Sequence, residues 1–273
     1  MERDRALGSM KQFIQDTLGR FGYELRRRRP RGFLPFVEEV SLVGVTFQFW
    51  VGDPIGIEWY NPEGHRRAVE PRETARILRP GDRVMDIGAH HGFETMLFSK
   101  LVGESGAVLA VEPFPFNAMM VWAQIGLNRA ANCQVLQIAA GSENGKLRIS
   151  AESNARVSAD GIEVPVLTAD ELDIKYGPFT AIKIDVEGFE HEVLKGAKNL
   201  LSRRPKILLE LHAELLPRFD SSVEKVLAML PNYGGTFMPR VGDWTAVHPY
   251  PDEKVPTDVS VNLFLTYSRA MPG

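Results

Sequence analysis

From Asp82 to the end of the chain, short apolar runs alternate with longer segments of helical periodicity. Such alternation is typical of a doubly wound sheet of parallel strands with helices on both faces. The expected strands are Arg83–Ile87, Ala107–Val111, Cys133–Ile138, Ala181–Asp185 and Lys206–Leu211, and the expected helices are Phe93–Leu101, Phe116–Ala130 and Glu190–Leu201.

The last apolar run, Val259–Tyr267, differs because apolar residues alternate with mostly polar ones. Alternation of this kind suits a half-exposed antiparallel strand added to a buried parallel sheet. We therefore expect residues 81–273 to form a Rossmann-like α/β domain with a seven-stranded, mostly parallel sheet and an antiparallel last strand.

Two smaller regions precede this domain. Residues 33–80 predict a cap with a β-hairpin around Val40–Trp50 and a helix at Pro71–Leu78. Residues 1–32 predict a basic helical prefix, since residues 1–31 hold nine Lys or Arg and four Asp or Glu. The prefix has two interpretations: peripheral contact with anionic lipid or an acidic partner, or a docked helix with a solvated basic end.

Composition narrows the function classes. No stretch approaches the roughly 20 apolar residues of a membrane span, and no secretory leader is evident, so we expect a cytoplasmic protein. The single Cys133 excludes an internal disulfide and a thiol zinc cluster. The net charge is −3 although the N-terminal segment is basic, which argues against nucleic acid as the main partner.

The segment from Val84 to Phe93 reads as a buried strand, a glycine turn and the start of a helix. Ligands of open α/β sheets bind beyond the carboxyl ends of the strands. The dinucleotide pattern G-x-G-x-x-G is not met, because His90 and Phe93 stand where its second and third glycines belong. Asp86 before the turn would repel a diphosphate and favour an ammonium or sulfonium group.

The second strand ends at Glu112, and a carboxylate at that place can accept hydrogen bonds from two ribose hydroxyls. Asp86, Gly88 and Glu112 together indicate a pocket for a phosphate-free adenosine. The alternative is the ordinary polarity of strand ends.

Three blocks of the sequence resemble the FkbM family of class I S-adenosylmethionine-dependent methyltransferases. They are Asp86–Gly92 with Val111–Pro113, Ala181–Ala197, and Leu208–His212. The resemblance covers about residues 70–215. It implies S-adenosyl-L-methionine as cofactor, bound by Asp86, Gly88, Ala89, His90, Glu112, Pro113 and Asp185.

Asp185, Glu210 and His212 are the candidate catalytic residues. Glu210 and His212 lie two residues apart on one strand, so their side chains share a face, and Asp185 ends the neighbouring strand. His212 can serve as a general base, because an imidazole with a pKa near 6.5 is half-available at cytoplasmic pH. Two alternatives stay open: the three residues bind Mg²⁺ or Mn²⁺, or they form a structural hydrogen-bond network.

These expectations lead to O-methylation of a hydroxyl on a sugar, glycolipid or secondary metabolite. N-methylation of a small-molecule amine is the alternative within the class, and an NAD-dependent sugar oxidoreductase is the alternative outside it. A non-catalytic binding module is disfavoured by the titratable residues at the strand ends. Residues 33–70, 150–163 and 240–258 are expected to build the acceptor pocket, with Trp50, Trp59, Tyr60 and Trp244 as its candidate aromatic residues.

Overall fold

The computed structural model describes residues 33–60, 69–240 and 246–267. The chain divides into two compact units, Met1–Leu34 and Pro35–Gly273. The basic helix expected in residues 1–32 lies outside the described residues, and so does Trp244. The sheets and helices of the described residues belong to the second unit.

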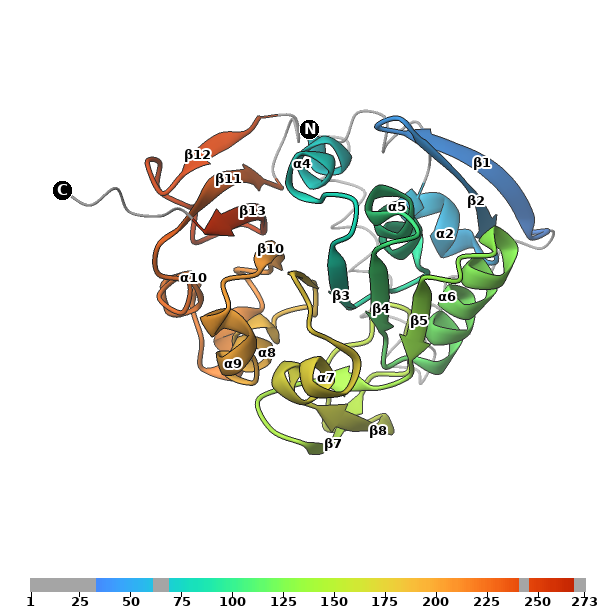
Figure 1. Cartoon of the computed structure of the whole chain (residues 1–273). Helices are drawn as coiled ribbons and strands as arrows, with labels where there is room; N and C mark the ends of the chain where they lie inside the picture. Colours follow the sequence, from blue (N-terminus) through green and yellow to red (C-terminus); the bar gives the residue numbers. More distant parts are fainter. Residues whose placement is uncertain (1–32, 61–68, 241–245, 268–273) are drawn as a thin grey trace, which may run out of the picture. The chain divides into compact units, whose positions relative to one another are not determined.

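An eight-stranded sheet forms the centre of this unit, in the order β12-β11-β13-β10-β9-β3-β4-β5 (Figure 1). Its parallel strands are β3 (Arg83–Ile87), β4 (Ala107–Val111), β5 (Cys133–Leu136), β9 (Ala181–Ile184) and β10 (Lys206–Leu211). Its antiparallel strands are β11 (Tyr233–Pro239), β12 (His248–Tyr250) and β13 (Val261–Tyr267). The predicted mostly parallel sheet with an antiparallel last strand is thus present. It has one strand more than expected, because β12 adds to its edge.

Helices cover both faces of the sheet (Figure 1). One face carries α4 (Val69–Ile77), α5 (Phe93–Val102) and α6 (Pro115–Asn128), and the other carries α7 (Ala169–Tyr176), α8 (Glu190–Lys195), α9 (Lys198–Ser202) and α10 (Val223–Leu227). Burial from both sides explains why the middle strands are continuously apolar: Val84, Met85, Ile182 and Ile184 are all fully buried. A short 3-10 helix, η1 (Leu216–Phe219), follows β10. The single helix expected at Glu190–Leu201 is divided into α8 and α9 at Gly196.

The cap is a hairpin of β1 (Phe36–Leu42) and β2 (Val45–Val51), followed by the helix α2 (Pro54–Tyr60). Val43 and Gly44 form the tight turn, both at positive φ. The hairpin is held to α6 by the Gln124 amide, which donates to the Trp50 carbonyl at 2.8 Å and accepts from the Trp50 N–H at 2.9 Å. The cap therefore packs over helices α5 and α6 instead of extending the main sheet.

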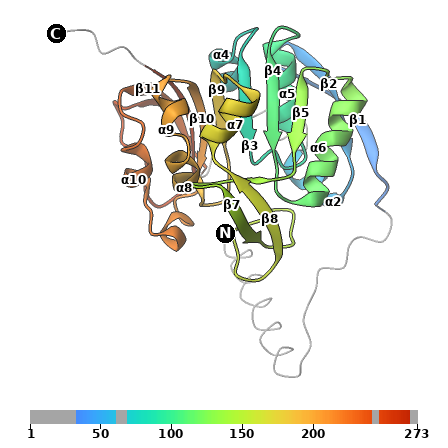
Figure 2. The same cartoon turned by 60° about the horizontal axis from the view of Figure 1, so that its bottom comes forward.

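A second, three-stranded sheet follows β5 and has the order β6-β8-β7, with β6 (Ala139–Ala140), β7 (Gly145–Ile149) and β8 (Ile162–Leu167). Its β7–β8 hairpin comes forward in Figure 2. The polar segment 151–160 joins β7 to β8 and makes one isolated bridge, Ile149 to Val157. This sheet was not predicted, and it stands beside the carboxyl ends of the main strands.

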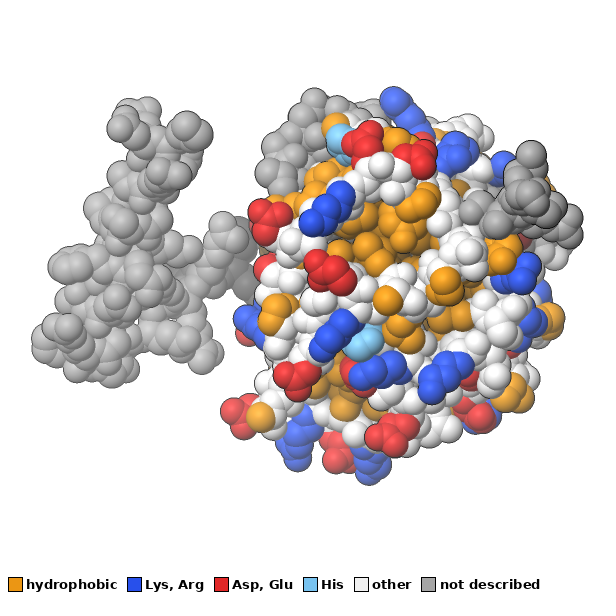
Figure 3. All heavy atoms as spheres, turned by 90° about the vertical axis from the view of Figure 1, so that its left-hand side faces the viewer, with side chains coloured by type: hydrophobic (Ala, Val, Ile, Leu, Met, Phe, Trp, Pro, Cys, Tyr) orange, Lys and Arg blue, Asp and Glu red, His pale blue; other side chains and the backbone are white. Residues whose placement is uncertain are grey.

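The surface on the side of β11, β12 and α10 carries acidic and basic side chains interspersed with hydrophobic ones (Figure 3). No helix within the described ranges combines the length and the apolar character that a membrane crossing requires.

Candidate active site

A cavity of about 370 Å³ lies at the carboxyl ends of β3, β4 and β9. Its wall includes residues of the cap helix α2, of the 153–157 segment and of β11. It lies beyond the carboxyl ends of the strands, where ligands of open α/β sheets bind, and its size suits a ligand-binding cleft. Of the expected cofactor-binding residues, six line this cavity: Gly88, Ala89, His90, Glu112, Pro113 and Asp185.

The glycine turn presses against the end of the neighbouring strand. Gly88 has a φ of +82°, and a Cβ atom there would lie 1.7 Å from the carbonyl oxygen of Asp185. The Gly88 N–H donates to the Val111 carbonyl at 2.9 Å, which ties the turn to β4 as well. Only glycine allows three strand ends to meet this closely beside the cavity.

Glu112 directly follows β4 and is hydrogen-bonded to the glycine turn. One of its carboxylate oxygens accepts from the His90 N–H at 2.8 Å, and the other accepts from the Phe114 N–H at 2.9 Å. Burial raises the pKa of Glu112 to about 7, although these two bonds oppose the rise. A carboxylate fixed in this way at the cavity wall is suited to accept further hydrogen bonds from ribose hydroxyls.

His90 connects the turn to two other regions of the chain. Its Nδ1 pairs with the Tyr60 hydroxyl of α2, and its Nε2 lies 2.7 Å from the Ser153 hydroxyl of the β7–β8 connection. Burial, together with the stacked His91 ring, lowers the pKa of His90 to about 3, so the ring is neutral. The sequence indicated neither contact.

Asp86 is placed differently from the expectation. Its side chain is fully buried behind the turn and is not part of the cavity wall. The Thr95 hydroxyl donates to it at 2.5 Å, and Lys183 lies 3.6 Å away. Burial raises the pKa of Asp86 to about 6. Asp86 therefore supports the turn from behind, because the side chain points towards α5.

Lys183 lies on β9, next to the end of β3, and 5% of its surface is exposed. It donates to the Gly88 carbonyl at 2.8 Å and lies 3.3 Å from Asp185 and 3.1 Å from Glu94. Burial opposes its charge, but the surrounding carboxylates raise its pKa well above the ordinary value. Lys183 is thus paired with carboxylates, and Glu94 is a cavity residue that the sequence did not indicate.

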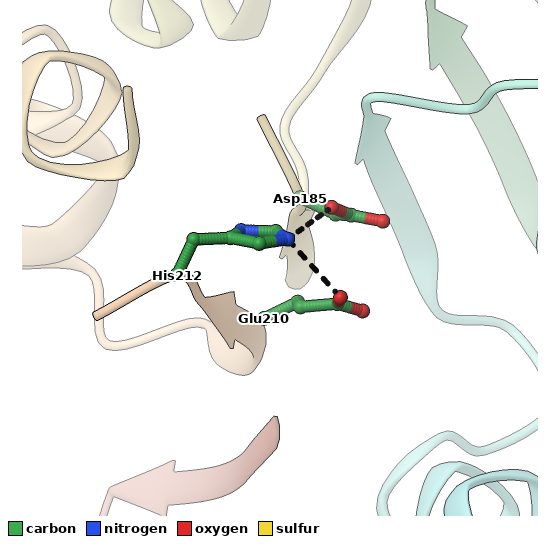
Figure 4. Close-up of side chains that lie close together, drawn as sticks. All are labelled: Asp185, Glu210 and His212. Carbon is green, nitrogen blue, oxygen red and sulfur yellow. Dashed lines mark ion pairs between the residues drawn. The ribbon is translucent and has the colours of Figure 1, made fainter. Parts of the chain in front are cut away.

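The three candidate catalytic residues do meet (Figure 4). The Nε2 atom of His212 lies 3.3 Å from a Glu210 oxygen, 3.9 Å from an Asp185 oxygen and 4.0 Å from a Glu187 oxygen. These three carboxylates line the cavity. On the other side of the ring, Nδ1 lies 2.8 Å from the fully buried carboxylate of Glu190.

These neighbours determine the charge of His212. Burial lowers its pKa, but the bond to Glu190 and the charges of Asp185 and Glu187 outweigh burial and raise the pKa to about 9. His212 is thus protonated at neutral pH, contrary to the half-available imidazole expected from its ordinary pKa. The sequence also missed Glu190 as its partner, because an acidic residue at the start of a helix has an ordinary explanation.

Asp185, Glu210 and His212 also carry the donor types of a metal site, with ligand atoms all within 4.8 Å of one another. The two carboxylates are already paired, however: Asp185 with Lys183, and Glu210 with Arg240. These two cations and the protonated His212 supply the positive charge that an ion would bring. We therefore assign no metal to this cluster.

The cavity as a whole is acidic. Its lining includes seven carboxyl groups, of Glu58, Glu70, Glu94, Glu112, Asp185, Glu187 and Glu210. Among the described residues that line it, the basic ones are Lys183 and Arg240, each paired with a carboxylate. A diphosphate would meet repulsion here, whereas a nucleoside with a sulfonium and an ammonium group fits the donor and charge pattern.

The doubly wound sheet, the glycine turn and the acidic second strand end define the class of S-adenosylmethionine-dependent methyltransferases. A family model described as "Methyltransferase FkbM domain" matches residues 86–237, which is more than half of the chain. The chain belongs to the FkbM methyltransferase family. The alternative of an NAD-dependent oxidoreductase is therefore wrong.

Solved structures with a related arrangement include a SAM-dependent methyltransferase from Aquifex aeolicus, with 16% identity, 79% of this chain and 99% of that chain covered, and a TM-score of 0.44. An rRNA methylase from Streptococcus thermophilus has 12% identity, coverages of 73% and 94%, and a TM-score of 0.44. Fibrillarin from Aeropyrum pernix, in complex with natively bound S-adenosyl-L-methionine, has 14% identity, coverages of 68% and 67%, and a TM-score of 0.40. No curated protein matches the chain in sequence.

The regions expected to form the acceptor pocket contribute unevenly. Trp59 and Tyr60 of α2 line the cavity, as do residues 153–155 and Arg240. Trp50 does not line it, and its backbone is hydrogen-bonded to Gln124 of α6.

Proposed function

We propose that this enzyme transfers a methyl group to a hydroxyl of a sugar, a glycolipid or a secondary metabolite, with His212 as the general base. The observation that carries the proposal is the direction of the His212 ring. Glu190 holds Nδ1, so Nε2 is directed at the three carboxylates of the cavity wall. A hydroxyl is a weak nucleophile, and a base beside the acceptor makes it reactive.

The cofactor's nucleoside is assigned to the turn Gly88–His90 with Glu112 and Pro113, and its amino-acid end to the side of Asp185. When bound, S-adenosylmethionine supplies a methyl group activated by the positive charge of its sulfonium. The chain's own residues orient the acceptor and remove its proton. Glu112 accepts hydrogen bonds, and the Gly88 turn gives the ligand close access to the backbone.

The proton of the acceptor hydroxyl passes to Nε2 of His212, while the hydroxyl oxygen gains the methyl group. The resulting imidazolium is stabilised by Asp185, Glu187 and Glu210. Without cofactor, the pKa of about 9 keeps His212 protonated at neutral pH. A positive charge brought into the cavity opposes the protonated ring and lowers that pKa, which frees the base when it is needed.

N-methylation of an amine is the second candidate, and the excess of carboxyl groups in the cavity favours it, because an amine acceptor is cationic before it reacts. The product distinguishes the two: ¹³C NMR of a product labelled from [methyl-¹³C]S-adenosylmethionine separates an O-methyl from an N-methyl carbon.

The base is tested by His212→Ala, with His248→Ala as the control at a partly exposed histidine that pairs with Glu253 instead of the cavity carboxylates. Labelled methyl transfer to a panel of sugar and polyketide hydroxyl acceptors measures turnover, and calorimetric titration with S-adenosylhomocysteine measures cofactor affinity. We expect His212→Ala to lower kcat by about 10²–10⁴-fold, with the affinity for S-adenosylhomocysteine unchanged within about threefold. Turnover equal to that of the control would refute the assignment.

A further inference from the structure

Beside the main cavity lies a small recess between α4, α5 and β13. Its volume is about 10 Å³, which is room for one water-sized group. Its lining shares Glu70, Glu94, Lys183 and Glu210 with the cavity and adds Asn262 of β13. The recess therefore adjoins the cavity at the strand ends where Lys183 bonds the Gly88 carbonyl.

One acceptor in this recess lacks a partner, and a carboxyl group lies beside it. Asn262 is 5% exposed, and its Oδ1 atom is fully buried with no hydrogen bond. The Glu70 carboxyl, in the first turn of α4, lines the same recess and is partly buried. A buried acceptor without a donor is destabilising, so a ligand that brings a hydrogen-bond donor to Asn262 would be favoured here.

The acidic side chains around the recess also favour a ligand that is positively charged. Burial, and then the charge of Glu94, raise the pKa of Glu70 to about 8, against the opposing charges of Arg240 and Lys183; Asp185 adds to the rise. At neutral pH Glu70 therefore keeps a proton, because burial and then the charge of Glu94 favour its neutral form. The proton neutralises the Glu70 carboxyl group, as a bound cation would.

We propose that the recess formed by Glu70, Glu94 and Asn262 binds the ammonium group at the amino-acid end of S-adenosylmethionine. An ammonium group is of the right size, brings three hydrogen-bond donors and adds a second positive charge, beside that of Lys183, to the carboxyl groups of the recess. The proposal rests on the proposed cofactor orientation, with the nucleoside at Glu112 and the amino-acid end towards Asp185. Binding of the ammonium ionises Glu70 and releases its proton to solvent.

An ammonium of the acceptor would suit the same chemistry, and two ligands distinguish the sources. S-adenosylhomocysteine carries the amino-acid end, whereas 5′-methylthioadenosine has the same adenosine and thioether without it. Calorimetric titrations of both ligands compare wild type with Glu94→Gln. Glu104→Gln is the control, because it makes the same charge change at an exposed position outside the cavity.

We expect Glu94→Gln to weaken S-adenosylhomocysteine binding by about 10-fold or more and to leave 5′-methylthioadenosine binding unchanged within about twofold. The control changes neither. Equal weakening of both ligands would overturn the proposal in favour of a general role in the pocket. Unchanged binding of both would overturn it in favour of an acceptor amine.

Glu94 also pairs with Lys183, so a second variant guards against a misfolded site. In Glu70→Gln the side chain stays neutral and keeps nearly the shape of a protonated glutamic acid, but it has no carboxyl proton to release. Titrations at pH 7 in two buffers of different ionisation enthalpy report protons released on binding. Wild type should release protons with S-adenosylhomocysteine but not with 5′-methylthioadenosine, and Glu70→Gln should release none. Wild type that releases none with either ligand contradicts the proposal. These binding measurements are independent of the turnover readout for His212, so the two assignments fail separately.

Discussion

Substitution of Gly88 by alanine tests whether the close meeting of strand ends is what builds the cofactor site. The new Cβ atom would lie 1.7 Å from the Asp185 carbonyl oxygen, far inside van der Waals contact, and that oxygen belongs to the backbone of the neighbouring strand end. The strand ends must therefore separate. A non-glycine residue at positive φ costs about 1–2 kcal/mol, and forced repacking costs about 1–3 kcal/mol.

The matched control is Gly44→Ala. Gly44 has the same φ of +82°, but nothing lies within 4 Å of its added Cβ atom, so this variant carries the backbone strain without the clash. At about 2–4 °C per kcal/mol for a chain of this size, Gly88→Ala should lower Tm by about 5–15 °C and the control by about 2–8 °C. Calorimetric titration with S-adenosylhomocysteine should show lost affinity for Gly88→Ala alone. The reasoning is refuted if Gly88→Ala is no less stable than Gly44→Ala and binds S-adenosylhomocysteine as wild type does.

Three further outcomes are expected. Because His212 must lose a proton before it can act, kcat/KM for S-adenosylmethionine, which reports the cofactor-free enzyme, should rise with pH towards a pKa of about 9. Glu190→Gln should move that limb to lower pH, and a limb that stays in place would argue against the Glu190 contact. Because Lys183 and Arg240 already pair with the clustered carboxylates, removal of divalent ions with a chelator should leave turnover unchanged, and recovery of lost turnover by added Mn²⁺ would contradict this. Since Glu70 has a folded-state pKa of about 8 against an ordinary 4.5, the folded protein holds a proton that the unfolded chain gives up, so wild-type stability falls as pH rises through that window. Glu70→Gln has no titrating group at this position, so its Tm should rise relative to that of wild type between pH 5 and pH 8.5. The change in relative stability should be on the order of 1–2 kcal/mol, after allowance for the partly exposed side chain. A Tm difference that stays constant over this pH range would contradict the prediction.

The sequence predicted the parallel strands of the central sheet well because buried strands leave a strong apolar pattern. Continuous apolar runs identified the parallel strands, and the two-residue period correctly placed Glu210 and His212 on one face. Convergence with Asp185 followed from the shared edge of parallel strands. These are properties of regular elements, and they can be read without knowledge of the tertiary structure.

Charge states and irregular segments could not be read in the same way. The pKa of His212 depends on Glu190, which the pattern explained as an ordinary residue of a helix N-terminus. Asp86 differs from expectation because its partner, Thr95, lies nine residues away on α5. Tyr60 and Ser153 reach His90 from a cap helix and an irregular connection, whose positions no periodicity determines.

The β7–β8 hairpin contributes to the cavity wall but forms no part of the main sheet (Figure 2). Its length and side chains are thus free to diverge while the strands that carry the cofactor residues keep their order. If this wall contacts the acceptor, as we propose, an exchange of residues 145–167 between two related enzymes should carry acceptor preference with it.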